Sequence, residues 1–405
     1  MSYPEIQFIN HASIIISYKN IHLLSDPWYS GTAFDNGWKL LYENDNDEIL
    51  KMLKKKVTHI WISHEHPDHF SIGFFKRFKD VLIKKRIQIL FQETKDKRVY
   101  KFLKNNNFLV KELLFMKPFR LSKDFSVKCL KDGFYDSALL SSCGNKKILN
   151  LNDCQINDIK KAIKLKKKVG NIDILLTQFS YAAWKGGSKN LKWRKNAARD
   201  KINSIKTQIK YLKPKYLIPF ASFIYFCNKD NFYMNDSINK PNDIYKELKD
   251  EQSSILIMAP MDKFDFLNAN CNDVAINFWK KRIGDVKIQE KICSSRVSID
   301  KLKESFKIYQ DRIKRNNNIL LMRIIYYLSP LSFFRPVYIF LKDYGKTFEI
   351  DYVQNRFRFS TKEPMLSMQS ESLMFIFKNQ FGFDTLNVNS RFEEVNKLGW
   401  STASR

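Results

Sequence analysis

Apolar and polar residues follow two patterns along the chain. Short runs rich in β-branched and aromatic residues predict buried strands, and longer segments with apolar residues every three or four positions predict amphipathic helices. Turn pairs such as Lys19-Asn20 and Asp132-Gly133 separate several of the strands. The predicted strands are 6–8, 12–18, 21–25, 57–62, 88–91, 108–115, 125–130, 137–142, 147–152, 172–177, 215–218, 255–258 and 347–353, and the predicted helices are 45–55, 71–79, 94–105, 300–314 and 368–377.

The strand predicted at 57–62 ends in a dense group of metal-ligating residues. His64, His66, Asp68 and His69 fall within six positions. Neutral imidazoles and carboxylates bind zinc and iron, and a turn after a strand can direct several of them to one point. His64 and His66 can hold one ion while Asp68 and His69 reach a second. The motif therefore predicts one or two divalent metal ions, with iron and zinc both open.

A further candidate ligand, Asp153, follows the strand predicted at 147–152. A carboxylate in this position can bridge two cations. It can equally cap the helix that follows, and the two roles are compatible.

The run from His64 to His69 resembles the HxHxDH signature of the metallo-β-lactamase superfamily. Residues from about 5 to 270 are similar to one branch, the catalytic part of CMP-N-acetylneuraminate hydroxylase and its bacterial relatives. The stretches that carry this similarity are 11–13, 24–28, 31–38, 148–154 and 214–223.

The resemblance implies a mixed α/β (α+β) fold, a four-layer αβ/βα sandwich followed by a small C-terminal α+β domain. It implies Asp153 as the bridging aspartate. We expect Asp68 to be both a ligand and the favoured base. His11 and Asp26 would lie beside the metals and orient ligands or assist catalysis, although for His11 a capping or packing role is equally open. We expect a metal-binding domain at 1–285 and a substrate-covering domain at 286–405.

Two positions depart from the superfamily pattern. All six histidines lie at or before position 69, so the later histidine ligands are missing. The third ligand of the first metal would fall near Asp132 or Asp136, and the last histidine would fall at about Ala221, which cannot coordinate a metal. Carboxylate in place of imidazole favours an oxygen-rich site such as iron. The same loss would also fit a degenerate site.

Aromatic and basic residues in two irregular segments, 28–38 and 178–199, are candidates for substrate binding because stacking and cations suit a nucleotide. Packing over the sheet edge, or an ordinary basic loop, is the alternative. The candidates are Trp28, Trp38, Tyr181, Trp184, Lys185 and Arg194.

The formal net charge of +28 favours anionic partners. The chain shows no nucleic-acid motif, so we expect an anionic small molecule, a nucleotide-linked or phosphorylated sugar, and no nucleic acid. Six cysteines without a CxxC pair, and a first segment without signal-peptide features, predict a cytoplasmic protein.

The stretch 319–341 is mostly apolar, but Arg323, Pro330, Arg335 and Pro336 interrupt it. We expect no membrane-spanning helix there. Association with a membrane surface stays open because basic and apolar residues alternate.

The hydroxylase resemblance implies oxygen insertion in surface polysaccharide synthesis. The vertebrate-type enzyme carries a Rieske cluster, and this chain offers no such ligand pair, so oxygen insertion would need a separate electron-transfer protein. Hydrolysis of a phosphodiester, lactone or amide bond is the alternative, and a non-catalytic binding protein with a degenerate metal site is a third.

Overall fold

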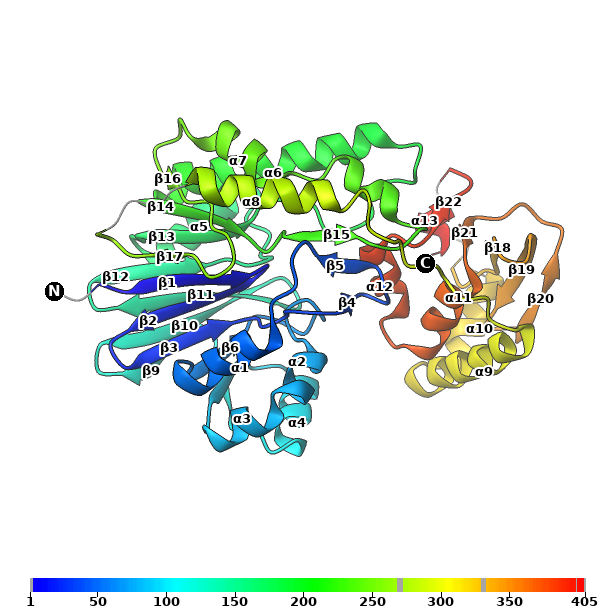
Figure 1. Ribbon diagram of the computed structural model, residues 1–405. Coiled ribbons are helices and arrows are strands. Elements are labelled where there is room, and N and C mark those ends of the chain that lie inside the picture. The colour runs from blue at the N-terminus through cyan, green and yellow to red at the C-terminus, as the bar shows by residue number, and fades with distance from the viewer. Residues whose placement is uncertain (1–2, 268–271, 329–332, 398, 404–405) are drawn as a thin grey trace.

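The computed structural model describes residues 3–267, 272–328, 333–397 and 399–403. Within these residues two seven-stranded sheets pack face to face, and helices cover both outer faces (Figure 1). The predicted four-layer αβ/βα sandwich is therefore confirmed. The first sheet has the order β17-β1-β2-β3-β6-β7-β8 and consists of β1 (Glu5–Asn10), β2 (Ser13–Tyr18), β3 (Ile21–Ser25), β6 (His59–Ile62), β7 (Gln88–Gln92), β8 (Val110–Leu113) and β17 (Lys263–Phe264).

The second sheet changes from antiparallel to parallel along its width. Strands β9 to β12 pair antiparallel, and β12, β13, β14 and β16 pair parallel. The strand order is β16-β14-β13-β12-β11-β10-β9, with β9 (Pro118–Ser122), β10 (Phe125–Asp132), β11 (Asp136–Cys143), β12 (Lys146–Asn150), β13 (Ile174–Gln178), β14 (Tyr216–Phe220) and β16 (Ser254–Ile255).

Amphipathic helices form the two outer layers. α1 begins at an N-cap, Asp45, whose side chain accepts from the amides of Asp47 and Glu48, and its buried residues recur with helical spacing. The helices over the first sheet are α1 (Asn46–Lys55), α2 (Ile72–Arg77), α3 (Lys79–Lys84) and α4 (Arg98–Asn105), and those over the second are α5 (Ile159–Val169), α6 (Leu191–Leu212), α7 (Pro241–Leu248) and α8 (Asn272–Asp285).

The main hydrophobic core lies between the two sheets. Ile6, Phe8 and Ile14 of the first sheet pack with Val127 and Ile148 of the second. Because side chains alternate across a strand, the opposite faces of these strands pack against the helices. This double burial explains why the strands read as nearly continuous apolar runs.

A small sheet and the C-terminal region complete the molecule. β4 (Thr32–Ala33), β5 (Trp38–Leu40) and β15 (Ile224–Phe226) pair antiparallel beside the sandwich, and a 3-10 helix spans Phe232–Asp236. The C-terminal sheet has the order β20-β19-β18-β21-β22 and consists of β18 (Val337–Leu341), β19 (Lys346–Asp351), β20 (Arg356–Ser360), β21 (Leu366–Met368) and β22 (Glu393–Glu394). The helices of this region are α9 (Ile299–Asn316), α10 (Ile319–Leu328), α11 (Ser370–Lys378), α12 (Gly382–Asn389) and α13 (Gly399–Ala403).

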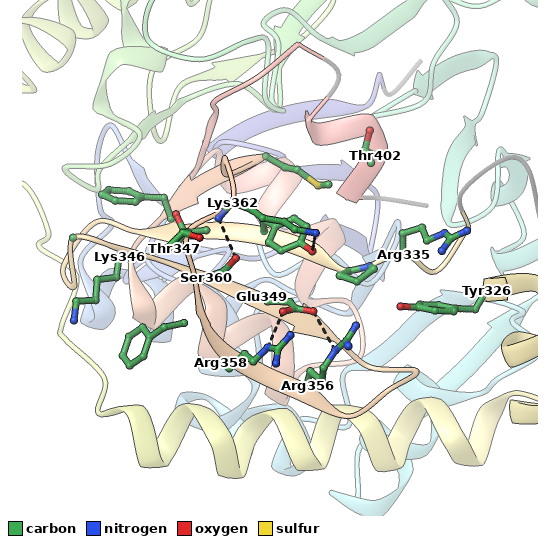
Figure 2. Close-up of a pocket in the computed structure, with 17 residues that line it drawn as sticks. Tyr326, Arg335, Lys346, Thr347, Glu349, Arg356, Arg358, Ser360, Lys362 and Thr402 are labelled. Atoms are coloured by element: carbon green, nitrogen blue, oxygen red, sulfur yellow. Dashed lines mark hydrogen bonds and ion pairs between the residues drawn. The ribbon is translucent and has the colours of Figure 1, made fainter.

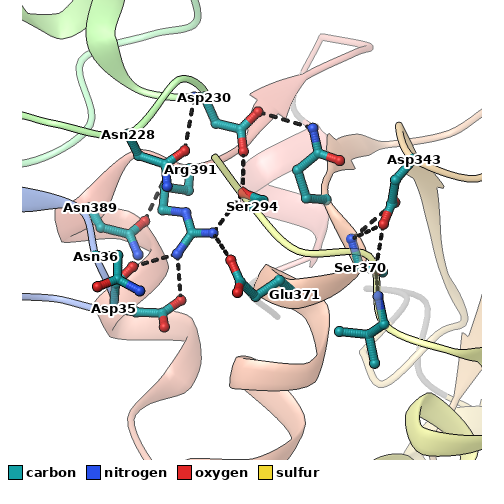
Figure 3. Close-up of polar contacts among 12 residues, drawn as sticks. Asp35, Asn36, Asn228, Asp230, Ser294, Asp343, Ser370, Glu371, Asn389 and Arg391 are labelled. Carbon is teal, nitrogen blue, oxygen red and sulfur yellow. Dashed lines mark hydrogen bonds and ion pairs between the residues drawn. The ribbon is translucent and has the colours of Figure 1, made fainter. Parts of the chain in front are cut away.

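A buried arginine joins the C-terminal region to the loop before β5 (Figure 3). The Arg391 guanidinium donates to the Asp35 carboxylate at 2.8 Å, to the Glu371 carboxylate at 2.6 Å and to Ser294 Oγ at 2.8 Å. Nearby, Asn389 Nδ2 donates to the Phe34 carbonyl at 3.1 Å. A buried guanidinium needs such partners, so these contacts hold the two regions together.

The structure refines the sequence predictions for two segments. The segment predicted as irregular, 178–199, is irregular only as far as Asn190, because α6 begins at Leu191. The apolar stretch 319–341 contains α10 and β18, and Pro330, like Cys271, lies outside the described residues. None of the helices within the described ranges combines the length and the hydropathy needed to cross a bilayer. The predicted boundary at 285/286 coincides with the end of α8 and stays a prediction.

Candidate metal centre

The candidate ligands lie where parallel strands from both sheets end. β3 and β6 run parallel in the first sheet, as do β12 and β13 in the second. Asp26 directly follows β3, the motif follows β6, and Asp153 comes three residues after β12. The carboxyl ends of these strands meet at one edge of the sandwich, which brings residues far apart in sequence together.

Two groups of ligand atoms lie close enough to hold metal ions. In the first group, atoms of His64, His69 and Asp153 lie within 4.8 Å of one another. In the second group, atoms of His11, Asp68 and His69 meet the same limit. His69 belongs to both groups, so the described residues offer two adjoining positions for a cation.

The distances place Asp153 inside the histidine cluster. Its Oδ2 lies 3.4 Å from His69 Nε2 and 4.0 Å from His64 Nε2. His66 joins the first group, with its Nδ1 2.9 Å from His64 Nε2. In the second group, Asp68 Oδ2 lies 3.2 Å from His69 Nε2 and 3.4 Å from His11 Nε2. The structure thus brings together all the residues of the motif, Asp153 and His11.

Buried polar groups contact the motif on the ring nitrogens that do not face the metal positions. Ser63 Oγ lies 2.9 Å from His64 Nδ1, and Ser63 N donates to Asp26 Oδ1 at 2.7 Å. The other oxygen of Asp26 lies 3.3 Å from His69 Nδ1 and accepts from the Asn152 amide. Such contacts select the ring nitrogen that faces the metal.

The charges at the site are unbalanced without a cation. Burial opposes ionisation of Asp68, but the charge of His69 and the hydrogen bond with His11 hold its pKa well below the usual value. Burial also opposes protonation of His69, yet Asp68 and Asp153 raise its pKa well above the usual range. Buried carboxylates therefore favour a positive charge at this position, which a metal ion would supply.

Several buried atoms at the site have no hydrogen-bond partner among the described residues. They include Asp68 Oδ1 and His69 Nε2. Unpaired buried polar atoms are costly in folded proteins, and an ion explains them. Imidazole nitrogens and carboxylate oxygens are suitable ligands for both iron and zinc, so the residues fit the predicted one or two divalent metals.

Of the two candidates for the third ligand, Asp136 is the one at the site. Its Oδ1 lies 3.8 Å from His64 Nε2, whereas Asp132 accepts from the backbone amide of Gln155 at 2.6 Å. Burial and the neighbouring Asp153 raise the pKa of Asp136 to about 7. For Asp153 the charge of His69 outweighs burial and lowers the pKa to about 2.

His11 lies beside the position where the last histidine is missing. The Ala221 amide donates to the His11 carbonyl at 2.8 Å, and both residues have positive φ. The imidazole of His11 reaches Asp68 from this position. It packs edge-on against Trp28, with 5.6 Å between the ring centroids.

The predicted aromatic substrate contacts are buried packing residues. Trp28 and Trp38 are 1% and 3% exposed, and Tyr181 donates its hydroxyl proton to the Met234 carbonyl at 2.5 Å. Trp184 packs against Phe392 and against Trp400 of α13. The burial of these rings supports the alternative of packing over the sheet edge. Trp28 also lines a cavity of about 430 Å³ together with Glu65 and Pro67 of the motif, so a substrate contact through Trp28 stays a prediction.

The two predicted basic contacts differ in placement. Arg194 is buried, pairs with Asp236 at 2.6 Å and donates to the Gly187 carbonyl at 2.7 Å, so its guanidinium is occupied inside the protein. Lys185 is half-buried and donates to the Trp184 carbonyl at 3.3 Å, and burial lowers its pKa. Among the described residues Lys185 has no ion-pair partner, unlike Arg194, so its ammonium group is the better candidate for an anion.

A second lysine at the site, Lys201 of α6, was not predicted from the sequence. Its Nζ donates to Gln178 Oε1, and Gln178 Nε2 donates to Asp153 Oδ1 at 3.1 Å. Burial lowers the pKa of Lys201, and nearby Asp153 opposes this effect. The signal was available, since Lys201 is four residues from both Ala197 and Ile205 on the buried face of α6.

The facing sheets, the motif turn after β6 and Asp153 at the end of β12 define a protein of the metallo-β-lactamase fold. The chain is 26% identical over 257 residues to cytidine monophosphate-N-acetylneuraminic acid hydroxylase from Xenopus laevis, which covers 59% of this chain and 41% of the relative. It is 24% identical over 296 residues to the Danio rerio protein of the same name, covering 67% and 48%. The chain thus spans less than half the length of these relatives.

Solved structures of similar shape include hydroxylases and hydrolases. CmlA, a diiron β-hydroxylase from Streptomyces venezuelae, is 12% identical with a TM-score of 0.47, covering 66% of this chain and 55% of that chain. Igni18, a metallo hydrolase from Ignicoccus hospitalis, is 13% identical with a TM-score of 0.47, covering 66% and 100%. No family model matches the chain.

Proposed function

We propose that the chain is a metal-dependent enzyme that inserts oxygen into an anionic sugar, nucleotide-linked or phosphorylated, using electrons from a separate donor protein. The observation that carries this proposal is the pair of adjoining histidine and carboxylate groups that share His69. Similarity to the cytidine monophosphate-N-acetylneuraminic acid hydroxylases supports the reaction and the substrate class. We place this activity in the cytoplasm, in the synthesis of surface polysaccharide.

We assign His64, His66, Asp136 and Asp153 to one metal position, and His11, Asp68 and His69 to the other. When bound, the metal would supply either the centre for dioxygen reduction or a water whose pKa is lowered to about 7. We propose Asp68 as a ligand, and its expected role as the base stays a prediction.

We propose that Lys185 and Lys201 bind the anionic part of the substrate. Lys201 is connected to Asp153 of the metal centre by hydrogen bonds through Gln178. The positive charge of Lys185 is close enough to lower the pKa of Lys201. A pair of half-buried ammonium groups beside an acidic metal centre suits a phosphate that must lie next to the metals.

The proposal is tested with the purified full chain, loaded with iron, supplied with a chemical reductant and with cytidine monophosphate-N-acetylneuraminic acid. We expect oxygen consumption together with a product that has gained one oxygen atom by mass spectrometry. The His66→Ala variant is the matched control and should show neither, because it lacks one ligand.

Two results would reject oxygen insertion. Cleavage of a phosphodiester, lactone or amide substrate by zinc-loaded protein, without oxygen consumption, would establish the hydrolase alternative. If the protein takes up neither iron nor zinc and still binds the nucleotide sugar, the non-catalytic alternative is established.

A further inference from the structure

Helix α10 of the C-terminal region has apolar side chains on its exposed side. Met322 and Tyr326 face the protein and are buried. The opposite side is what we call the α10 face, which consists of Leu320 (69% exposed), Leu321 (53%), Ile324 (47%), Tyr327 (63%) and Leu328 (77%). A surface helix normally turns such residues inward, so this arrangement needs a partner.

The α10 face is one continuous stripe. At roughly 100° per residue, the five side chains occupy an arc of roughly 120° around the helix axis. Arg323 is exposed at one edge of this arc. A stripe of leucine and isoleucine with a tyrosine and a flanking arginine is typical of a helix that lies in a lipid–water interface.

The charged residues that flank α10 in the sequence are all basic, whereas the Asp351 carboxylate that accepts from the Tyr326 hydroxyl is buried and paired with Arg356. Between Asp311 and Asp343 the sequence contains no acidic residue. It contains six basic residues in the same interval, Arg312, Lys314, Arg315, Arg323, Arg335 and Lys342. Lys314, Arg315 and Arg323 are exposed. The apolar stripe therefore lies within a basic environment that would attract an anionic surface.

A basic hollow continues this environment away from the helix (Figure 2). The hollow has a volume of about 1290 Å³, and Tyr326 of α10 and Arg335 contribute to its lining. Five basic side chains and one carboxylate, Glu349, line it, and Glu349 pairs with Arg356 and Arg358. The surplus of positive charge extends over the sheet next to α10.

We propose that α10 binds the surface of an anionic lipid bilayer, with the α10 face inserted among the acyl chains and the surrounding bases at the headgroups. A second copy of the chain would also cover the apolar stripe, but it would bring two strongly basic surfaces into contact. Repulsion between the two basic surfaces opposes the association of two copies, whereas the same basic residues attract anionic lipids. Charge complementarity thus selects the bilayer. This inference is independent of the metal centre.

The test is sedimentation of the full chain with vesicles of phosphatidylcholine alone or mixed with phosphatidylglycerol. We expect binding to the mixed vesicles only, weakening as salt is raised because the attraction is screened. The variant Leu320→Asp with Leu328→Asp should bind at least about tenfold more weakly, since two inserted side chains become charged. Both side chains are exposed, so the fold should be retained.

A matched control carries the same change in charge elsewhere. Val274→Asp with Ile288→Asp alters two side chains that are 67% and 85% exposed and lie outside α10. It should bind within about threefold of the unchanged protein. The proposal is overturned by equal losses in both variants, by equal binding to phosphatidylcholine alone, or by no binding at low salt. It is also overturned if the protein forms a dimer that only the α10 variant dissociates.

Discussion

At the scale of single residues, His11 is a candidate ligand that lies next to Ala221, where we expected a histidine ligand to be missing. Its Nε2 is 3.4 Å from Asp68 Oδ2, and its backbone accepts from Ala221. We predict that His11→Ala weakens binding of one of the two metals by about 10- to 100-fold, since a ligand or its orientation is lost. Isothermal titration with metal measures this.

The matched control is His22→Ala, which removes a histidine outside both ligand groups. It should leave both binding steps unchanged. Equal titration curves for the unchanged protein and His11→Ala would assign His11 to packing against Trp28.

Asp136 gives metal binding a pH dependence. Burial and Asp153 raise the pKa of Asp136 to about 7, so in the metal-free protein this carboxyl is largely protonated at pH 6 and ionised at pH 8. Because a ligand must be ionised to bind, metal affinity should rise through this interval and one proton should be released. Asp136→Asn should remove that step, and titration in buffers of different ionisation enthalpy counts the protons. An unchanged proton count in the variant would contradict the assignment.

At the scale of elements, α12 packs against the loop before β5 at a glycine. A Cβ atom on Gly37 would lie 2.5 Å from Asn389 Cβ and 2.9 Å from the Phe34 carbonyl oxygen. The loop also carries Phe34, whose ring centroid is 5.6 Å from that of His66. Through this loop the C-terminal region is in contact with the metal centre.

We predict that Gly37→Ala lowers the free energy of unfolding by about 1–3 kcal/mol because either α12 or the loop must shift. Urea denaturation measures this change. The control is Gly284→Ala in α8, where a Cβ meets nothing within 4 Å. That substitution should stabilise the protein by about 0.4–1 kcal/mol through the unfolded chain. A loss no larger than the experimental error in Gly37→Ala would show that the contact between loop and α12 is loose.

At the scale of the whole molecule, the sandwich could be predicted because its strands are buried on both faces. Their apolar runs stand out, and ligands such as Asp153 are found by looking where a run ends. The C-terminal contacts could not be predicted in this way. Arg391 meets Asp35 across 356 positions, and no local pattern records that pairing.

Burial of polar and aromatic residues was the other failure of prediction. Arg194 and Trp38 lie in segments with the composition of a binding loop, yet both are 1–3% exposed. A basic residue that binds substrate and one that pairs internally with Asp236 look alike in sequence. Lys201 is the opposite case, a lysine at the site that was not predicted. Only its position on the buried face of α6 distinguishes it from the many solvent-exposed lysines.

The central claim is that the residues around His69 hold metal, and the metal content of the whole protein tests it most directly. The protein is purified without chelators or nickel affinity and measured by elemental analysis, beside a double variant, His69→Ala with Asp153→Ala, that removes the residue common to both groups and the carboxylate next to it. We predict one to two equivalents of iron or zinc per chain, about the stoichiometry of one- and two-metal sites, and close to none in the variant. Absence of metal from the unchanged protein after incubation with either ion, or equal content in the variant, would contradict the account.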